Sequence, residues 1–196
     1  MRIKIGLIAF LFFVMGFQIN AEAVEVPREV VELTRHYVDR LKAGEVREAV
    51  DEAWDVDALL ESTFGLTYLE LPETQRARSR EAFTRFAQST FANIKILRLI
   101  ATVEIVRLRA KVIDDRTIII RFVLNGDEGR FKSVNSLLWK NTDRGWRIVD
   151  ARNANSLSIR VGLASAYMEF FTGPGDTLPD TLERAAVKLQ EMMSRR

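Results

Sequence analysis

The sequence predicts an α+β fold in which helices precede and follow a four-stranded antiparallel sheet. Two observations lead to this fold class. Apolar residues recur with a helical period near 3.6 in the first half and at the C-terminal end, and they alternate with polar residues between residues 103 and 151. With 196 residues, 47% hydrophobic and 29% charged, the chain has the composition of one globular domain.

The N-terminal segment has the pattern of a secretory signal peptide. Arg2 and Lys4 precede an apolar run of 13 residues, which is followed by the small-residue site Ala21-Glu22-Ala23. The run is shorter than the roughly 20 residues of a membrane-spanning helix, although a membrane anchor is the alternative. We expect residues 1–23 to be removed after about Ala23, which leaves a single exported domain at residues 24–196.

Three short amphipathic helices are expected between residues 27 and 65. Pro27 suits the first turn of the first helix, and Gly44 suits its end. One face of the second helix is apolar and carries Val46, Ala49, Val50, Ala53 and Trp54. Asp55 or Asp57 can cap the third helix, which ends at Gly65.

A longer helix is expected from Pro72 to Leu97, after a loop that ends at Leu71. Its apolar stripe contains Ala82, Phe83, Phe86, Ala87, Thr90, Phe91 and Ile94, and its other face is rich in arginine. At 1.5 Å per residue this helix would be about 39 Å long, enough to form one wall of the domain.

Four strands are expected at residues 103–113, 117–124, 130–140 and 146–151, joined by turns too short for anything but antiparallel pairing. Alternation slips at Val106, which indicates a β-bulge. The second strand is apolar on both faces and is therefore expected inside the sheet. An apolar segment at residues 157–171 and a helix after Pro179 complete the chain.

The sequence contains little that supports catalysis. It has no cysteine, which excludes a disulfide framework, a thiolate metal site and a cysteine nucleophile. A Gly-x-Ser-x-Gly nucleophile motif is absent, and 29 Lys+Arg against 27 Asp+Glu do not favour a nucleic-acid partner. We expect no catalytic residue, metal or cofactor. The enzyme alternative is an isomerase or dehydratase that uses Asp150, His36 or Tyr167.

Two segments carry a family resemblance. The first contains the aromatic-Asp pair Trp54-Asp55, a Gly65 turn, Gln75-Arg76 and a helix with spaced phenylalanines, and the second contains Trp139-Lys140 and then Gly145-Trp146-Arg147-Ile148-Val149-Asp150. Their order and spacing resemble the MlaC, or toluene-tolerance, family of periplasmic phospholipid-binding transport proteins. The resemblance covers roughly residues 30–189 in element order.

The resemblance implies a helical layer packed on a curved four-stranded antiparallel sheet, an NTF2-like cone with an apolar cavity for lipid tails. It implies a periplasmic, non-enzymatic carrier that shuttles diacyl phospholipid between an outer-membrane lipoprotein complex and an inner-membrane ABC transporter complex. Such traffic serves outer membrane lipid asymmetry.

The expected lining of the cavity is apolar and comes from helices and strands: Leu60, Phe64, Phe83, Phe86, Phe91, Val103, Ile105, Ile120, Phe122, Leu138, Trp146 and Ile148. The alternative for each residue is ordinary core packing, since phenylalanines at helical spacing usually pack in the interior. A filled core between the long helix and the sheet would favour a secreted NTF2-like binding or scaffold module without lipid cargo.

Overall fold

The computed structural model describes residues 26–91, 102–126, 131–153 and 158–194 of the chain. Residues 1–23, for which the sequence predicts a signal peptide, lie outside these ranges, as does the end of the predicted long helix at residues 92–97. No helix among the described residues has an apolar stretch long enough to span a membrane.

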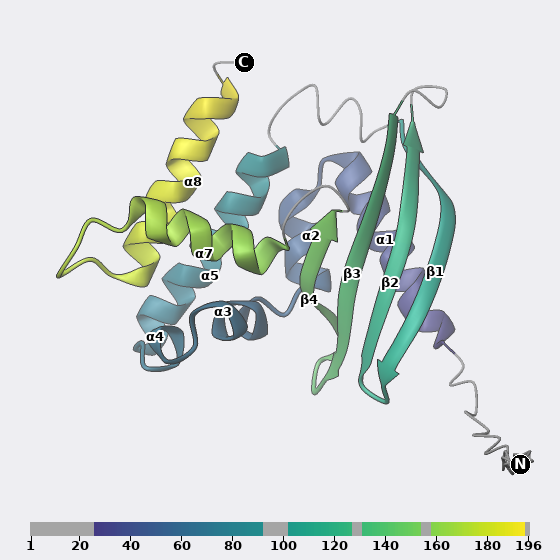
Figure 1. Ribbon diagram of the computed structural model, residues 1–196, viewed down its shortest axis with the longest axis horizontal. Helices are drawn as coiled ribbons and strands as arrows, with labels where there is room; N and C mark the ends of the chain where they lie inside the picture. The colour runs from purple at the N-terminus through teal and green to yellow at the C-terminus, as the bar shows by residue number, and fades with distance from the viewer. Residues whose placement is uncertain (1–25, 92–101, 127–130, 154–157, 195–196) are drawn as a thin grey trace, which may run out of the picture.

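The described elements follow the predicted order and confirm the α+β class (Figure 1). The N-terminal helices are α1 (Arg28–Ala43), α2 (Val46–Ala53), α3 (Val56–Phe64), α4 (Leu66–Leu69) and α5 (Glu73–Phe91). The strands are β1 (Glu104–Asp114), β2 (Thr117–Gly126), β3 (Phe131–Thr142) and β4 (Gly145–Asn153). The C-terminal helices are α7 (Ile159–Phe170) and α8 (Leu178–Ser194).

The four strands form one antiparallel meander in the order β1-β2-β3-β4, which places β2 inside the sheet as predicted. We call the face that carries Ile118, Ile120 and Phe122 of β2 the inner face, and the opposite face the outer face. The pairing of β1 with β2 shifts between Ile105 and Arg107, so the predicted bulge at Val106 is confirmed.

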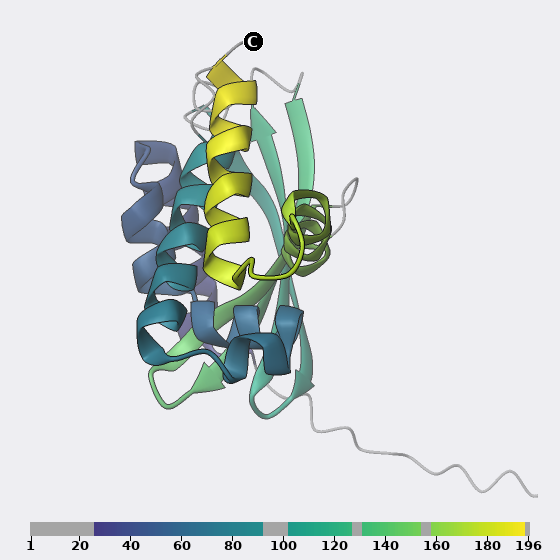
Figure 2. The same cartoon turned by 90° about the vertical axis from the view of Figure 1, so that its left-hand side faces the viewer.

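The helices lie on both sides of the sheet and beyond one edge. In Figure 1, α1 lies behind the sheet, against its inner face, whereas α7 lies on the other side and contacts β4. Beyond the β4 edge, α5 and α8 lie side by side (Figure 2). The described part of α5 packs mainly along α8, with further contacts to α2 and α3, instead of forming a wall directly opposite the sheet.

The apolar core lies between the inner face and the helices α1, α2 and α5. Trp54 occupies its centre, with its ring centroid 6.4 Å from that of Tyr37 and 5.7 Å from that of Phe83. The backbone next to Trp54 is tied to the sheet, because the amide of Asp55 donates to the carbonyl of Ile148 at 3.0 Å. The junction of α2 and α3 is therefore fixed against β4.

The ends of the first helices follow local rules. Gly44 ends α1 in the left-handed conformation with φ of 79°, where glycine is favoured because a Cβ would be strained. Asp55, and not Asp57, caps α3, since its carboxylate accepts a hydrogen bond from the amide of Ala58 at 2.9 Å.

Helix α4 corrects the sequence analysis, which expected a loop between Gly65 and Leu71. Its central residue Tyr68 is only 2% exposed and donates its hydroxyl hydrogen bond to the Asp57 carboxylate. One helical turn is too short for a periodic signal, and its stability comes from this contact with α3. The pattern of apolar residues could not reveal it.

Candidate functional site

Most of the residues predicted to line a cavity are on the inner side of the fold. Those buried in the apolar core are Leu60, Phe83, Ile120, Phe122, Trp146 and Ile148. Phe64, Phe86 and Ile105 are half-buried and pack against the same core. Val103 is fully buried and lies so close to Gly126 that a Cβ on that glycine would be 2.8 Å from Val103 Cγ1.

Two of the predicted residues do not join this group. Leu138 pairs with Ile119 on the outer face, whereas its neighbour Leu137 pairs with Ile120, is 3% exposed and belongs to the core. The two leucines are adjacent, so alternation alone could not decide which one points inward. Phe91 is the last residue of α5, and its side chain lies outside the described part of the protein.

The inner face is covered more completely at β3 and β4 than at β1. On β3 and β4, Leu137, Trp139 and Ile148 are almost inaccessible to solvent. On β1 and at the end of β2, the inward-facing apolar side chains are only half-buried: Ile105, Leu108, Ala110, Val112 and Leu124. We call these five residues the β1 apolar surface. Apart from Ile105 the sequence analysis did not include them in the predicted lining. Alternation with Glu104, Arg107, Arg109 and Lys111 had marked Ile105, Leu108, Ala110 and Val112 as one face of a strand, and Leu124 shares an apolar face with Ile118, Ile120 and Phe122.

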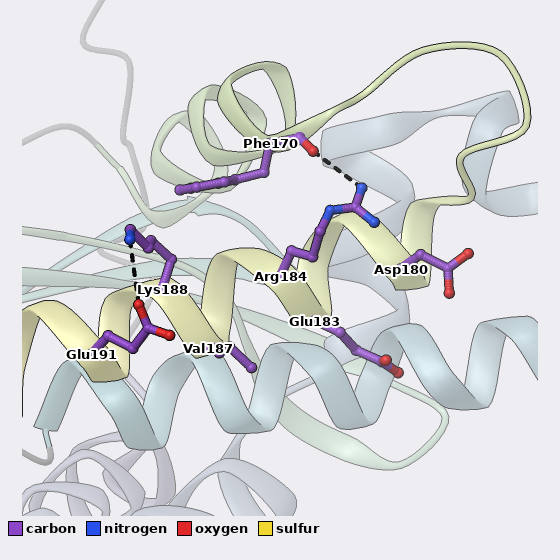
Figure 3. A pocket seen from close by; sticks show the side chains of 7 residues that line it. All are labelled: Phe170, Asp180, Glu183, Arg184, Val187, Lys188 and Glu191. Carbon is purple, nitrogen blue, oxygen red and sulfur yellow. Dashed lines mark hydrogen bonds and ion pairs between the residues drawn. The ribbon is translucent and has the colours of Figure 1, made fainter.

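Two hollows lined by described residues differ from the predicted apolar cavity. The first, of about 620 Å³, lies between α7 and α8 and is lined mainly by charged side chains (Figure 3). There Lys188 approaches Glu191 at 3.3 Å, and Arg184 donates to the carbonyl of Phe170 at 3.1 Å. The second, of about 370 Å³, lies between α2, α3 and α5. None of the twelve predicted lining residues borders either hollow.

Two residues that line the second hollow, Asp57 and Arg80, belong to a network of paired charges. Arg80 donates to Asp57 at 2.8 Å and to Glu73 at 2.6 Å, while the Tyr68 hydroxyl donates to the same Asp57 carboxylate. Burial, followed by the hydrogen bond to Asp57, raises the pKa of Tyr68. Burial acts against the charge of Asp57, but the hydrogen bonds from Tyr68 and Arg80 prevail and lower its pKa. These pairings hold α3, α4 and α5 together.

The residues of the enzyme alternative are not brought together. His36 is exposed on α1 and lies 3.1 Å from Glu52. Asp150 is on the outer face, where it accepts from the amide of Ala151 at 2.9 Å and pairs with Arg160 at 3.7 Å. Tyr167 packs its ring against those of Phe64 and Phe171. Among the described residues, no group of three or more acidic or histidine side chains could hold a metal ion.

The geometry therefore defines an α+β domain whose sheet carries an apolar inner face that is packed against helices at β3 and β4 and left partly open at β1. One solved structure of this architecture is the phospholipid-binding protein from Ralstonia solanacearum, determined in complex with a phospholipid. The two chains are 15% identical, the TM-score is 0.61, and the likeness covers 85% of this chain and 97% of the other. The likeness shows a shared fold. The chain matches no protein-family model and no curated protein sequence.

Proposed function

We propose that this protein binds a phospholipid and buries its acyl chains against the β1 apolar surface. The observation that carries this proposal is the set of five inward-facing apolar side chains that the described helices cover only in part. The solved structure that shares the fold is itself a complex with a phospholipid, which supports the same ligand here.

The chemistry of the β1 apolar surface suits acyl chains. Its five side chains, Ile105, Leu108, Ala110, Val112 and Leu124, contain no polar atom. Two acyl chains have on the order of 30 methylenes at about 0.8 kcal/mol each, so about 24 kcal/mol opposes their exposure to water. A protein that carries a diacyl lipid through water must cover most of the surface of the acyl chains. The apolar side chains of the inner face that are still accessible to solvent can contribute to this.

The resemblance to the MlaC family supports a more specific role as a periplasmic carrier. In this role residues 1–23 direct export, and the folded domain exchanges lipid with an inner-membrane ABC transporter complex and an outer-membrane lipoprotein complex. Burial of the ligand needs no catalytic group, so we propose a binding protein and not an enzyme. Export is tested by N-terminal sequencing of periplasmic protein, which should begin near Val24.

Lipid binding is tested by native mass spectrometry of protein purified without detergent, followed by extraction and identification of the lipid. We expect about one diacyl phospholipid per protein. A matched pair of variants locates the ligand: Leu108→Asp puts a charge on the β1 apolar surface, and Val106→Asp puts the same charge at the exposed bulge of the same strand. Leu108→Asp should lose most of its lipid because a carboxylate against acyl chains is costly, and Val106→Asp should retain it.

Folded wild-type protein that is free of ligand, and that takes up no lipid from vesicles, would refute the carrier function. The chain would then be better described as an NTF2-like binding or scaffold module without lipid cargo. The close packing of Trp54 against Phe83, with ring centroids 5.7 Å apart, is the observation that fits this second function. Transfer of a fluorescent phospholipid between donor and acceptor vesicles tests shuttling separately.

A further inference from the structure

The outer face of the sheet is strongly basic. Six exposed cationic side chains of β1, β2 and β3 point from it: Arg107, Arg109, Lys111, Arg121, Lys132 and Lys140. We call these six residues the basic face. Figure 1 shows this side of the sheet toward the viewer, with α1 behind the strands and no described helix in front of β1, β2 or β3. The basic face is therefore open to solvent.

Several arginines of the helices are held in ion pairs with carboxylates, whereas the cations of the basic face are not. On the helices, Arg47 meets Glu81 at 2.8 Å, and Arg78 meets Asp180 at 2.7 Å. Among the described residues, none of the six side chains of the basic face forms an ion pair. The net charge of the whole chain is only +2, so the excess of positive charge on this face comes from its distribution.

The arrangement has a cost for folding. Arg109 lies directly opposite Arg121 in the pairing of β1 with β2, and Lys140 lies directly opposite Arg147 in the pairing of β3 with β4. Like charges at opposed positions of antiparallel strands destabilise a sheet. The acidic residues on this face are Glu104 and Asp114, at the two ends of β1, and Asp150, which already pairs with Arg160. The hydrogen bond from the backbone amide of Arg116 is the largest influence that lowers the pKa of Asp114, and the charge of Lys140 is a smaller one. An external array of negative charge would relieve the repulsion.

We propose that the basic face docks on the surface of an anionic phospholipid bilayer. Alternate residues along a strand are about 7 Å apart, so the six cations form an extended array that matches many phosphates better than one small anion. Exposed apolar side chains at the two β1 bulges, Val106 and Ile113, lie beside this array and can enter the interfacial region. The choice of a bilayer over an acidic protein rests on the proposed phospholipid binding.

The test is co-sedimentation of the full purified protein with vesicles of phosphatidylcholine alone, or with vesicles in which about a third of the lipid is phosphatidylglycerol. Binding is expected only to the anionic vesicles and should be lost when salt is raised from about 50 mM to about 500 mM. Each cation removed near an anionic surface weakens binding about fivefold, so Arg109→Gln/Arg121→Gln should bind about 25-fold more weakly.

The matched control is Arg28→Gln/Arg35→Gln, which removes two exposed arginines of α1, behind the sheet, that form no ion pair in the described part of the protein. It should bind anionic vesicles within about twofold of the wild type, because its charges are on the other side of the protein. Equal losses in the two variants, or equal binding to neutral vesicles, would overturn the proposal. Binding to poly-glutamate without binding to any vesicle would also overturn it and would assign the face to an acidic protein.

Two further measurements separate this proposal from the proposed lipid cargo. Arg109→Gln/Arg121→Gln should retain bound lipid in native mass spectrometry, because its substitutions are on the outer face. Leu108→Asp should lose the lipid and still bind anionic vesicles. A protein without lipid that nevertheless sediments with anionic vesicles would refute the cargo and support docking, and the reverse result would refute docking alone.

Discussion

The register of β3 gives the most discriminating test of the structure, because two adjacent leucines should respond differently to the same substitution. Leu137 points to the inner face, where it is 3% exposed and lies opposite Ile120. Leu138 points to the outer face and is half-buried opposite Ile119. We therefore compare Leu137→Ala with Leu138→Ala.

The expected difference follows from burial. A leucine replaced by alanine in a core loses transfer free energy and leaves a cavity, at a cost of about 2–5 kcal/mol, and the nearly complete burial of Leu137 places it at about 3 kcal/mol. Leu138 already contacts solvent, so its replacement should cost less than about 1 kcal/mol. For a domain of this size, the loss at Leu137 corresponds to a fall in Tm of about 9 °C.

Urea denaturation followed by tryptophan fluorescence measures both free energies of unfolding. The probe suits the protein, since Trp54, Trp139 and Trp146 are all buried and report on the core. Equal losses for the two variants would refute the reasoning. A larger loss for Leu138→Ala would show that β3 is shifted by one residue and that Leu138 faces the core, as the sequence analysis expected.

Three other predictions concern stability. Tyr68→Phe removes a hydrogen bond to the charged Asp57 and should lower the free energy of unfolding by about 2 kcal/mol in urea titrations, and an unchanged value would contradict that bond. Hydrogen bonds from the backbone amide of Thr172 and from Arg184 and Thr181 lower the pKa of Asp176 to about 2. The pKa of an aspartate in the unfolded chain is about 3.9. The ionised Asp176 therefore stabilises the folded protein above about pH 4, and this stabilisation is lost as the pH falls toward 2. Asp176→Asn should therefore have a lower Tm than the wild type at neutral pH, and its Tm should change less between pH 4 and pH 2. Plots of Tm against pH that are parallel for the two proteins would refute this. Arg109→Gln should raise the free energy of unfolding by about 0.5 kcal/mol because it removes a like-charge pair with Arg121, and lower stability would contradict the β1–β2 register.

Local patterns explain why much of the fold could be predicted. The end of α1 at Gly44 depends on one left-handed glycine, and the bulge at Val106 depends on a break in a period of two. Both signals involve neighbours in the sequence. The choice between Asp55 and Asp57 as the cap of α3 was beyond such signals, because Asp57 is held by Tyr68 and Arg80 from other helices.

The candidate site was predictable only as a set of apolar residues. The sequence identified Ile120, Phe122 and Ile148 as apolar strand positions, and the structure places them in the packed core. Which inward-facing positions keep contact with solvent depends on where the helices end over the sheet. The partial exposure of Leu108 and Leu124 depends on how the helices pack against the strands, so only the structure shows it.

The sequence by itself determined the α+β class, the order of the elements and the meander, because hydrophobic period and turn length are properties of contiguous residues. It also showed that Arg107, Arg109 and Lys111 share one side of a strand. Only the tertiary structure decided that this side remains uncovered and that Leu137, not Leu138, faces the core. Coverage and register depend on contacts between residues far apart in the chain, which no local pattern contains.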